Sequence, residues 1–289
     1  MKANMEILHV SKQYKNGVTA LEDVSFCVGS GVFGLLGHNG AGKTTLMKAL
    51  VTVLKPSAGT IRVCGFDTAA QGKEVRARVG YLPQELAMYP SLSVWDFVNY
   101  MAQIKGIRDK KAVSAVLEEV EISRRKIGQL SGGMKRRVGI AQALIGNPPI
   151  LVVDEPTAGL DPEERVRFRG LLSRYASEGR TVLLSTHIVE DIHQLCGELA
   201  VLRKGRLFYA GTSATLLERV RDKVKILRLE NEAQLVELQK KAVVLSTTYE
   251  SHGLAARIMD EDDLYTQAQP VAATLEDAYV YCMGGKAHA

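Results

Sequence analysis

The sequence has little cysteine and no long apolar segment. Four of its 289 residues are cysteines (Cys27, Cys64, Cys196 and Cys282), and no two of them form a CxxC pair. Isolated cysteines of this kind are mostly small buried residues in a reducing compartment, so we expect neither disulfides nor a thiolate metal site. No apolar run approaches the roughly 18 residues that a membrane-spanning helix needs, and the N-terminus lacks the apolar core of a signal peptide. We therefore expect a soluble chain that reaches a membrane only through a partner.

A large excess of one charge is also absent. The chain has 37 Lys and Arg residues against 32 Asp and Glu residues, a formal net charge of +5. Its two basic stretches, Arg124–Lys126 and Lys135–Arg137, lack the interleaved aromatic residues that nucleic-acid-binding surfaces use. We interpret both stretches as solvated faces and expect no nucleic-acid partner.

Several apolar runs predict an α/β fold. Helical stretches separate some of these runs, which is typical of a mostly parallel sheet with both faces covered. The predicted buried strands are Val32–Leu36, Val79–Leu82, Ile150–Val153 and Val182–Leu184. Half-alternating segments at Met5–His9 and Thr60–Cys64 predict an antiparallel layer beside this sheet. Residues 93–146 contain no convincing strand, so we expect them to be helical.

The pattern changes near residue 220. Lys223–Leu229 alternates charged and apolar residues, as a half-exposed strand does, and Leu235–Lys240 is predicted to be a helix. Strand-like sequence continues to Met259, and Thr274–Cys282 predicts a short helix in which Thr274 and Asp277 have capping-box spacing. The apolar stripe of that helix is Leu275, Ala278, Tyr279 and Cys282. We divide the chain into residues 1–220 and a small α+β domain of residues 221–289.

The glycine-rich segment GHNGAGKTT, residues 37–45, predicts a triphosphate site. Gly37, Gly40 and Gly42 allow backbone N–H groups to approach phosphates closely, and a predicted strand precedes the loop. A helix predicted from about Lys43 to Leu54 places its positive N-terminal end at the phosphates. Lys43 can then reach the β- and γ-phosphates, while the Thr44 hydroxyl can ligate Mg²⁺. The remaining loop residues expected at the nucleotide are His38, Asn39, Ala41 and Thr45. A plain glycine-rich turn with a surface lysine is the alternative.

Polar residues follow three of the predicted parallel strands, at the edge where such sheets bind ligands. Asp154 is placed to hold Mg²⁺, and Glu155 to polarise an attacking water. Gln84 can contact Mg²⁺ or water, and His187 can contact a γ-phosphate oxygen. The alternatives are that the acidic pair caps a turn before Pro156, and that Gln84 and His187 have structural roles only.

A second glycine pair follows Ser131 in LSGGM, residues 130–134. Ser131 occupies a predicted N-cap position, and Gly132 and Gly133 expose backbone N–H groups, so the segment can form a second anion site. Because one nucleotide already has its loop at residues 37–45, the second site can serve an ATP held by another subunit. An ordinary glycine turn before a helix remains open.

These motifs, in this order, resemble the nucleotide-binding subunit of ABC transporters over about residues 3–220. GHNGAGKTT resembles the Walker A motif, LSGGM the family signature, and ILVVDE the Walker B motif with its catalytic glutamate. Gln84 in YLPQ resembles the Q-loop residue, Asp161 in GLDP the D-loop residue, and His187 in STH the switch histidine. Tyr14 resembles the aromatic residue that stacks on adenine, although it could also simply pack.

The resemblance implies a P-loop NTPase fold with a RecA-like sheet, an antiparallel layer, a helical subdomain at about residues 90–146 and a C-terminal accessory domain. It also implies ATP hydrolysis with Mg²⁺ in a head-to-tail dimer of two ABC ATPase subunits, identical or divergent. Ser131 and Gly133 would close on the ATP of the other subunit, and Glu155 would activate water while Lys43, His187 and Mg²⁺ stabilise the phosphoryl charge. The dimer would drive an integral-membrane permease from the cytoplasmic face of the membrane, meeting it near Gln84–Tyr100.

Two departures from the family pattern are Met134, where glutamine is usual, and His38, where proline is common. LSGGMKRR, STHIVED and TLEDAYVY resemble the branch that serves ABC-2-type exporters, including antibiotic and multidrug efflux systems. One alternative is a soluble ABC ATPase acting on ribosomes or nucleic acid, which a single Walker A motif and the lack of a heptad array disfavour. Another is a nucleotide-binding regulator without turnover, which Glu155 and His187 disfavour. Substrate contacts would lie in the permease, so the sequence indicates no substrate.

Overall fold

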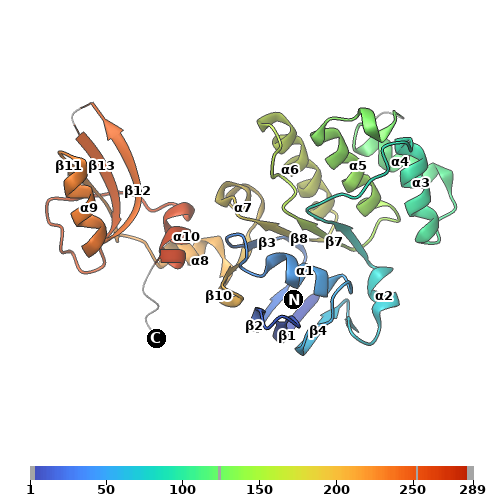
Figure 1. Cartoon of the computed structure of the whole chain (residues 1–289), viewed down its shortest axis with the longest axis horizontal. Helices are drawn as coiled ribbons and strands as arrows, with labels where there is room; N and C mark the ends of the chain where they lie inside the picture. The colour runs from blue at the N-terminus through green and yellow to red at the C-terminus, as the bar shows by residue number, and fades with distance from the viewer. Residues whose placement is uncertain (1–3, 123–124, 252, 285–289) are drawn as a thin grey trace. The chain divides into compact units, whose positions relative to one another are not determined.

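The computed structural model describes residues 4–122, 125–251 and 253–284, and the chain forms two compact units (Figure 1). The first unit is Met1–Ala210 and the second is Gly211–Ala289. The division therefore precedes the one we placed between residues 220 and 221. The reason is the helix α8 (Ser213–Glu218), which packs against α10 (Leu275–Gly284) within the second unit.

A six-stranded sheet in the order β10-β9-β3-β8-β7-β6 forms the centre of the first unit. All four predicted strands are present, as β3 (Gly31–Leu36), β6 (Val79–Leu82), β7 (Ile150–Asp154) and β8 (Thr181–Thr186). They pair in parallel, and every residue of β7 and β8 is buried. Two strands that we did not predict, β9 (Glu198–Arg203) and β10 (Arg206–Thr212), extend the sheet. The carboxyl ends of β3, β6, β7 and β8 consequently lie along one edge.

An antiparallel sheet covers one side of this centre, in the order β2-β1-β4-β5. Its strands are β1 (Met5–Gln13), β2 (Thr19–Val28), β4 (Ala58–Val63) and β5 (Phe66–Asp67). Met5, Ile7 and Leu21 pack with α1 (Lys43–Leu50) and the central sheet in one apolar core. The prediction that this helix continues to Leu54 was wrong: it ends at Leu50, and Thr52 has φ 65°, which a helix cannot contain.

Helices cover the other side of the central sheet, where Figure 1 shows α6 (Pro162–Ser177) and α7 (Val189–Leu195) opposite the antiparallel layer. A short helix α2 (Gly72–Arg76) precedes β6. The region that we expected to be helical contains α3 (Val94–Ile104), α4 (Lys110–Glu119), the 3₁₀ turn η1 (Ile127–Gln129) and α5 (Gly132–Leu144). Among its described residues the only extended pairing is an isolated bridge between Ser93 and Lys126.

The second unit contains an antiparallel sheet in the order β12-β13-β11-β14. Its elements are β11 (Val224–Leu229), α9 (Glu232–Lys241), β12 (Val243–Glu250), β13 (Gly253–Met259) and β14 (Gln269–Pro270). Leu227, Leu238 and Leu254 form part of a core between α9 and the sheet. The predicted stripe on α10 is buried, and Thr274 and Asp277 form the predicted capping box through bonds of 2.7 and 3.2 Å.

The described cysteines are only partly as expected. Cys196 and Cys282 are buried, but Cys27 is exposed and Cys64 is partly exposed, because they alternate outward or lie in a turn. None of the four forms a disulfide within the described residues. Within the described ranges, no group of three His, Cys, Asp or Glu residues could hold a metal ion by itself. No helix there has the length and apolar character that a membrane crossing requires.

Candidate nucleotide site

A cleft of about 500 Å³ lies at the carboxyl edge of the central sheet. Residues 38–45 form one wall, Val18–Ala20 another, and Gln84 and Glu155 complete it. Gln84 follows β6 and Glu155 follows β7, so the parallel register brings both loops to the start of α1. The structure thus brings together Lys43, Thr44, Gln84 and Glu155 as predicted.

The glycines of the loop are needed by the protein's own backbone. A Cβ on Gly37 would lie 2.6 Å from the Leu202 carbonyl oxygen, and one on Gly42 would lie 2.5 Å from that of Ala20. Gly42 also has φ 104°, a conformation that side-chain-bearing residues avoid. Gly42 is the N-cap of α1 and provides no side-chain cap, so the first N–H groups of the helix remain available to an anion.

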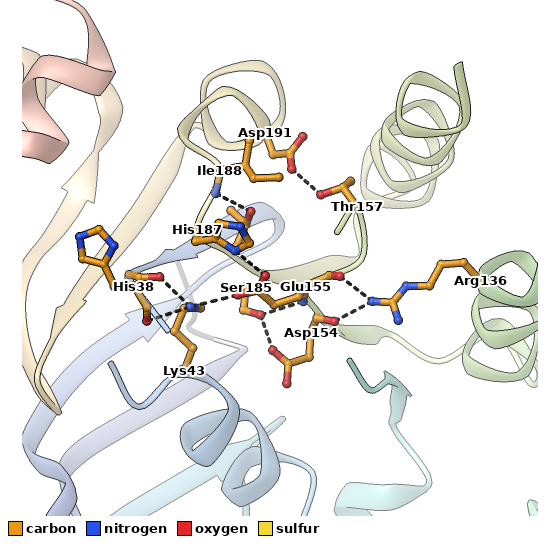
Figure 2. A network of polar contacts seen from close by, with 12 residues as sticks. His38, Lys43, Arg136, Asp154, Glu155, Thr157, Ser185, His187, Ile188 and Asp191 are labelled. Carbon is orange, nitrogen blue, oxygen red and sulfur yellow. Dashed lines mark hydrogen bonds and ion pairs between the residues drawn. The ribbon is translucent and has the colours of Figure 1, made fainter. Parts of the chain in front are cut away.

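Lys43 is buried and points into the loop that it follows (Figure 2). Its Nζ donates to the carbonyl oxygens of Gly37 (2.6 Å) and His38 (3.2 Å), and it lies 3.1 Å from Glu155 Oε1. The first turn of the helix also faces Tyr14, whose hydroxyl is 3.2 Å from Thr45 Oγ1. Tyr14 is 38% exposed and does not line the cleft; its hydroxyl contact places it beside Thr45, which does.

Glu155, the predicted base, contacts both the predicted switch histidine and Lys43. Its Oε2 is 2.6 Å from His187 Nδ1, while its other oxygen faces Lys43. Glu155 has φ 49°, so the chain turns sharply after β7 and places the carboxylate in the cleft. A base, a cation and an imidazole are consequently in direct contact at the phosphate loop.

Asp154 is fully buried behind Glu155, and one of its oxygens has no hydrogen-bond partner among the described residues. Its other oxygen accepts from the hydroxyl of Ser185, which also accepts the Glu155 N–H at 3.0 Å. We had not predicted this role of Ser185; the available signal was a polar residue directly after the apolar run of β8. The unsatisfied Oδ2, with the oxygens of Thr44 and Gln84, fits the ligand preference of Mg²⁺. Burial and the Asp154 charge together raise the pKa of the neighbouring Tyr81 to about 12.

Arg136 corrects our interpretation of the basic stretch 135–137 as a solvated face. The side chain is buried and donates to five backbone carbonyl oxygens in two loops. Helical periodicity could have indicated this, because Arg136 is four residues before the buried Ile140. Burial lowers the pKa of the guanidinium, and the Asp154 and Glu155 charges oppose that shift. Of the other stretch, Arg124 lies outside the described residues.

A second buried contact fixes the loop after Glu155. The Thr157 hydroxyl donates to the carboxylate of Asp191 on α7, and Arg169 lies 3.5 Å from the same carboxylate. Asp191 follows His187 by four residues, so it links the acidic loop to the helix that begins after the histidine. We had not predicted this pair either.

The signature and D-loop residues do not line the cleft. Ser131 is exposed and caps α5 by accepting the Met134 N–H at 3.3 Å. Asp161 is exposed and caps α6 by accepting the Glu164 N–H at 2.8 Å. Gly132 opens α5, and a Cβ on Gly133 would lie 3.2 Å from the Glu164 side chain. Within one chain, the two predicted anion sites are therefore separate.

Comparisons with known proteins agree with this arrangement. The family model described as ABC transporter matches residues 21–158. A Nod factor export ATP-binding protein I from Burkholderia thailandensis is 40% identical over 227 residues, covering 75% of this chain and 73% of the relative. The ABC transporter ATP-binding protein NatA of Bacillus subtilis is 36% identical over 216 residues, covering 72% of this chain and 87% of that relative.

A solved structure of a dimeric ATP-binding cassette, in a post-hydrolysis state with ADP and Pi, superimposes with a TM-score of 0.66 at 26% identity. The match covers 72% of this chain and 98% of that cassette. The chain therefore belongs to the ABC transporter family. It is an ABC ATPase that binds and hydrolyses ATP, and its P-loop fold is the one that the sequence motifs implied.

Proposed function

We propose that this chain is the ATP-hydrolysing subunit of an ABC exporter and powers a separate integral-membrane permease. The observation on which this depends is the contact between Lys43, Glu155 and His187 in the cleft, with the signature residues exposed elsewhere on the same unit. That arrangement fits a nucleotide held between two cassettes better than a site complete in one chain.

In the proposed reaction, residues 37–45 and the N-terminus of α1 bind the phosphates, and Tyr14 stacks on the adenine. Lys43 transfers its ion pair from Glu155 to phosphate oxygens, which leaves the carboxylate able to accept a proton from the attacking water. His187 orients Glu155 through Nδ1 and stabilises charge on the transferring phosphoryl group. Thr44, Gln84 and Asp154 would hold Mg²⁺, which neutralises charge on the phosphates when bound.

The proposed dimer is head to tail. Ser131 and Gly133 of one cassette complete the ATP site of the other, and Asp161 lies beside that site. The two cassettes can be identical or divergent. ATP closes the dimer, and hydrolysis reopens it.

Export is supported by the name of the Burkholderia relative, a Nod factor export protein. The permease is expected to dock near Gln84–Tyr100, where Tyr89 is 68% exposed and Tyr100 is 56% exposed. The chain would then be held at the cytoplasmic face of the membrane. We propose an accessory role for the second unit, in regulation or in dimer contact.

The test is to tag the chain in its native cell, solubilise the membranes mildly and identify the proteins that co-purify. A polytopic membrane protein in near-stoichiometric amount supports the proposal. A double variant with Tyr89→Ser and Tyr100→Ser should lose that protein, whereas the equally exposed Tyr249→Ser control should keep it. Recovery from the soluble fraction with ribosomal or nucleic-acid partners would instead support the soluble ABC ATPase.

A further inference from the structure

We propose that Arg136 is a positioning residue that couples the signature segment 131–133 to Glu155 and Gln84 of the same chain. This inference rests on the proposed function, because it takes Ser131 and Gly133 to contact the nucleotide of a second cassette. Through Arg136, a contact with that second nucleotide would set the alignment of the base that acts on the first.

The guanidinium of Arg136 joins two loops of the catalytic edge; Figure 2 shows its contacts with the first of them, at Asp154 and Glu155. Its Nε and NH2 nitrogens donate to the loop after β7, at the carbonyl oxygens of Asp154 (2.8 Å), Glu155 (2.7 Å) and Pro156 (3.1 Å). NH1 donates to the loop after β6, at those of Pro83 (3.0 Å) and Gln84 (2.8 Å). One side chain on α5 therefore fixes the backbone on which both Glu155 and Gln84 are mounted.

In the described parts of the chain the guanidinium of Arg136 has no direct carboxylate contact, and the five groups that accept its hydrogen bonds are backbone carbonyls. A buried cation in such surroundings is costly unless its donors are satisfied, so the geometry of the two loops is tied to its position. A neutral side chain would fill the space at lower cost if filling space were the only requirement.

The helix that bears Arg136 is firmly seated on β6. A Cβ on Gly80 would lie 2.2 Å from the Ala143 carbonyl oxygen, and one on Gly139 would lie 2.7 Å from the Leu82 side chain. Ser131 caps the N-terminus of the same helix, about 7 Å of helical rise from Arg136. Because α5 packs closely against β6, we expect a displacement of its N-terminus to move Arg136, and with it the two loops that Arg136 contacts.

Ser131 and Arg136 of one chain are proposed to act on different ATP sites, and this can be tested. Ser131 acts on the ATP site of the other cassette, whereas Arg136 acts on the Glu155 of its own chain. The alignment of Glu155 in each chain then depends, through α5, on whether the Ser131 of that chain is in contact with the ATP bound to the other cassette. Such coupling between two binding events is reciprocal.

The first experiment compares Arg136→Met and Arg136→Lys with Arg108→Met, an exposed arginine in the helical region. For Arg136→Met we expect kcat for ATP to fall about 10- to 100-fold, with the ATP dissociation constant from calorimetry changed less than about twofold. Arg136→Lys retains the charge but has no fork to span two loops, so its kcat should lie between Arg136→Met and wild type. If Arg136→Met precipitates, the lysine variant provides the same comparison. A kcat equal to that of Arg108→Met, or a parallel loss of ATP affinity, would overturn the proposal.

The second experiment mixes two full-length variants with impaired hydrolysis. A dimer of Arg136→Met and Ser131→Arg chains contains one site with an intact Glu155, an intact Arg136 and an intact opposing signature, but the chain that supplies this Glu155 lacks its own Ser131 contact. Hydrolysis should therefore return on mixing only in part, below the rate of a wild-type site. The mixture of Glu155→Gln with Ser131→Arg contains the same kind of site, with Glu155 on the Ser131→Arg chain, and therefore gives the reference rate. If that mixture recovers activity and the Arg136→Met mixture does not, Arg136 acts only through the signature and the proposal is wrong. Wild-type hydrolysis by Ser131→Arg alone would instead contradict the proposed dimer.

Discussion

The two units of the chain each contain a set of buried charged groups, and the two sets are paired differently. In the first unit, Lys43, Asp154 and Glu155 lie together at the carboxyl edge of a parallel sheet, and Asp154 Oδ2 lacks a hydrogen-bond partner among the described residues. In the second unit, Arg257 makes a double hydrogen bond to Asp277, and Asp277 also accepts the N–H and hydroxyl of Thr274. The first set is open, because Lys43 and Glu155 line a cleft that a ligand can enter. The second is closed, because its charged groups bond to one another and to Thr274.

The difference shows how a stabilising charge can be told from a functional one. Removing one partner of a closed pair leaves the other charge buried and uncompensated, so breaking the pair destabilises the fold. An open set leaves donors and acceptors for a ligand, and its groups can exchange partners as Lys43 is proposed to do. Substitutions in the first unit should therefore change catalysis more than stability, and substitutions in the second should do the reverse.

The largest effect is expected for Glu155→Gln. The amide cannot accept a proton from water, so turnover should fall about 10²- to 10⁴-fold while ATP still binds. Light scattering with MgATP should then show a doubled mass, because the closed dimer accumulates. Glu163→Gln, an exposed acid at the start of α6, serves as the control. Hydrolysis by Glu155→Gln at the wild-type rate would show that another group is the base.

Lys43→Ala should weaken ATP binding. It removes a buried cation that can reach phosphate oxygens, and a hydrogen bond to a charged group contributes about 1.5–3 kcal/mol, or roughly a 10- to 150-fold change in the dissociation constant. Calorimetry with ATP measures the change, and Lys48→Ala on the exposed side of α1 is the control. Equal affinity in the two variants would remove the role of the glycine-rich loop as a phosphate site.

Asp277→Asn should destabilise the second unit and leave hydrolysis unchanged. Burial acts to raise the pKa of Asp277, but bonds from Arg257 and Thr274 outweigh it and hold the pKa below its ordinary value. The stabilisation is therefore complete above about pH 4 and is lost as the pH falls through the lowered pKa. At pH 7 we expect a cost of about 2 kcal/mol, less than for a fully buried pair, because Arg257 is partly exposed.

Hydrogen exchange of peptides that span β13 and α10 checks this expectation, with the exposed Glu276→Gln as the control. The difference in protection between wild type and Asp277→Asn should hold from pH 7 to about pH 4 and shrink as the pH is lowered further. A constant difference would mean that Asp277 contributes through packing and not through its charge.

Thr274→Ala should have the smallest effect. It removes one half of the capping box of α10, a change that costs about 1 kcal/mol at a typical N-cap. The same exchange measurement should show faster exchange confined to the first turn of α10. Serine at this position should restore the protection, and failure to do so would contradict a capping role.

Several features of the fold were predictable because they are local. A fully apolar run such as Val79–Leu82 or Ile150–Val153 has few alternatives to a buried strand in a chain of this composition. The capping box at Thr274 depends on residues three positions apart, so its spacing is visible in the sequence. The Leu199–Leu202 run of β9 offered the same signal and was overlooked, whereas the bulged strand β2 lacks a regular alternation.

The candidate site divides in the same way. The phosphate loop is one contiguous segment, residues 37–45, and the spacing of its residues alone indicated the phosphate site. Ser185 and Arg136 could not be assigned from spacing, because their partners come from other strands and helices. A helical period shows which residues share a face, but it does not show what that face packs against.

By itself, the sequence determined the order of motifs, the identity of the groups that can bind phosphate or move a proton, and the buried strands that hold them. These depend on short stretches of chain and on residue type. Only the tertiary structure decided that Lys43 meets Glu155, that Ser185 holds both acids and that Arg136 is buried between two catalytic loops. Those contacts depend on parallel strand order and on helix packing, which place residues distant in the chain within hydrogen-bond distance.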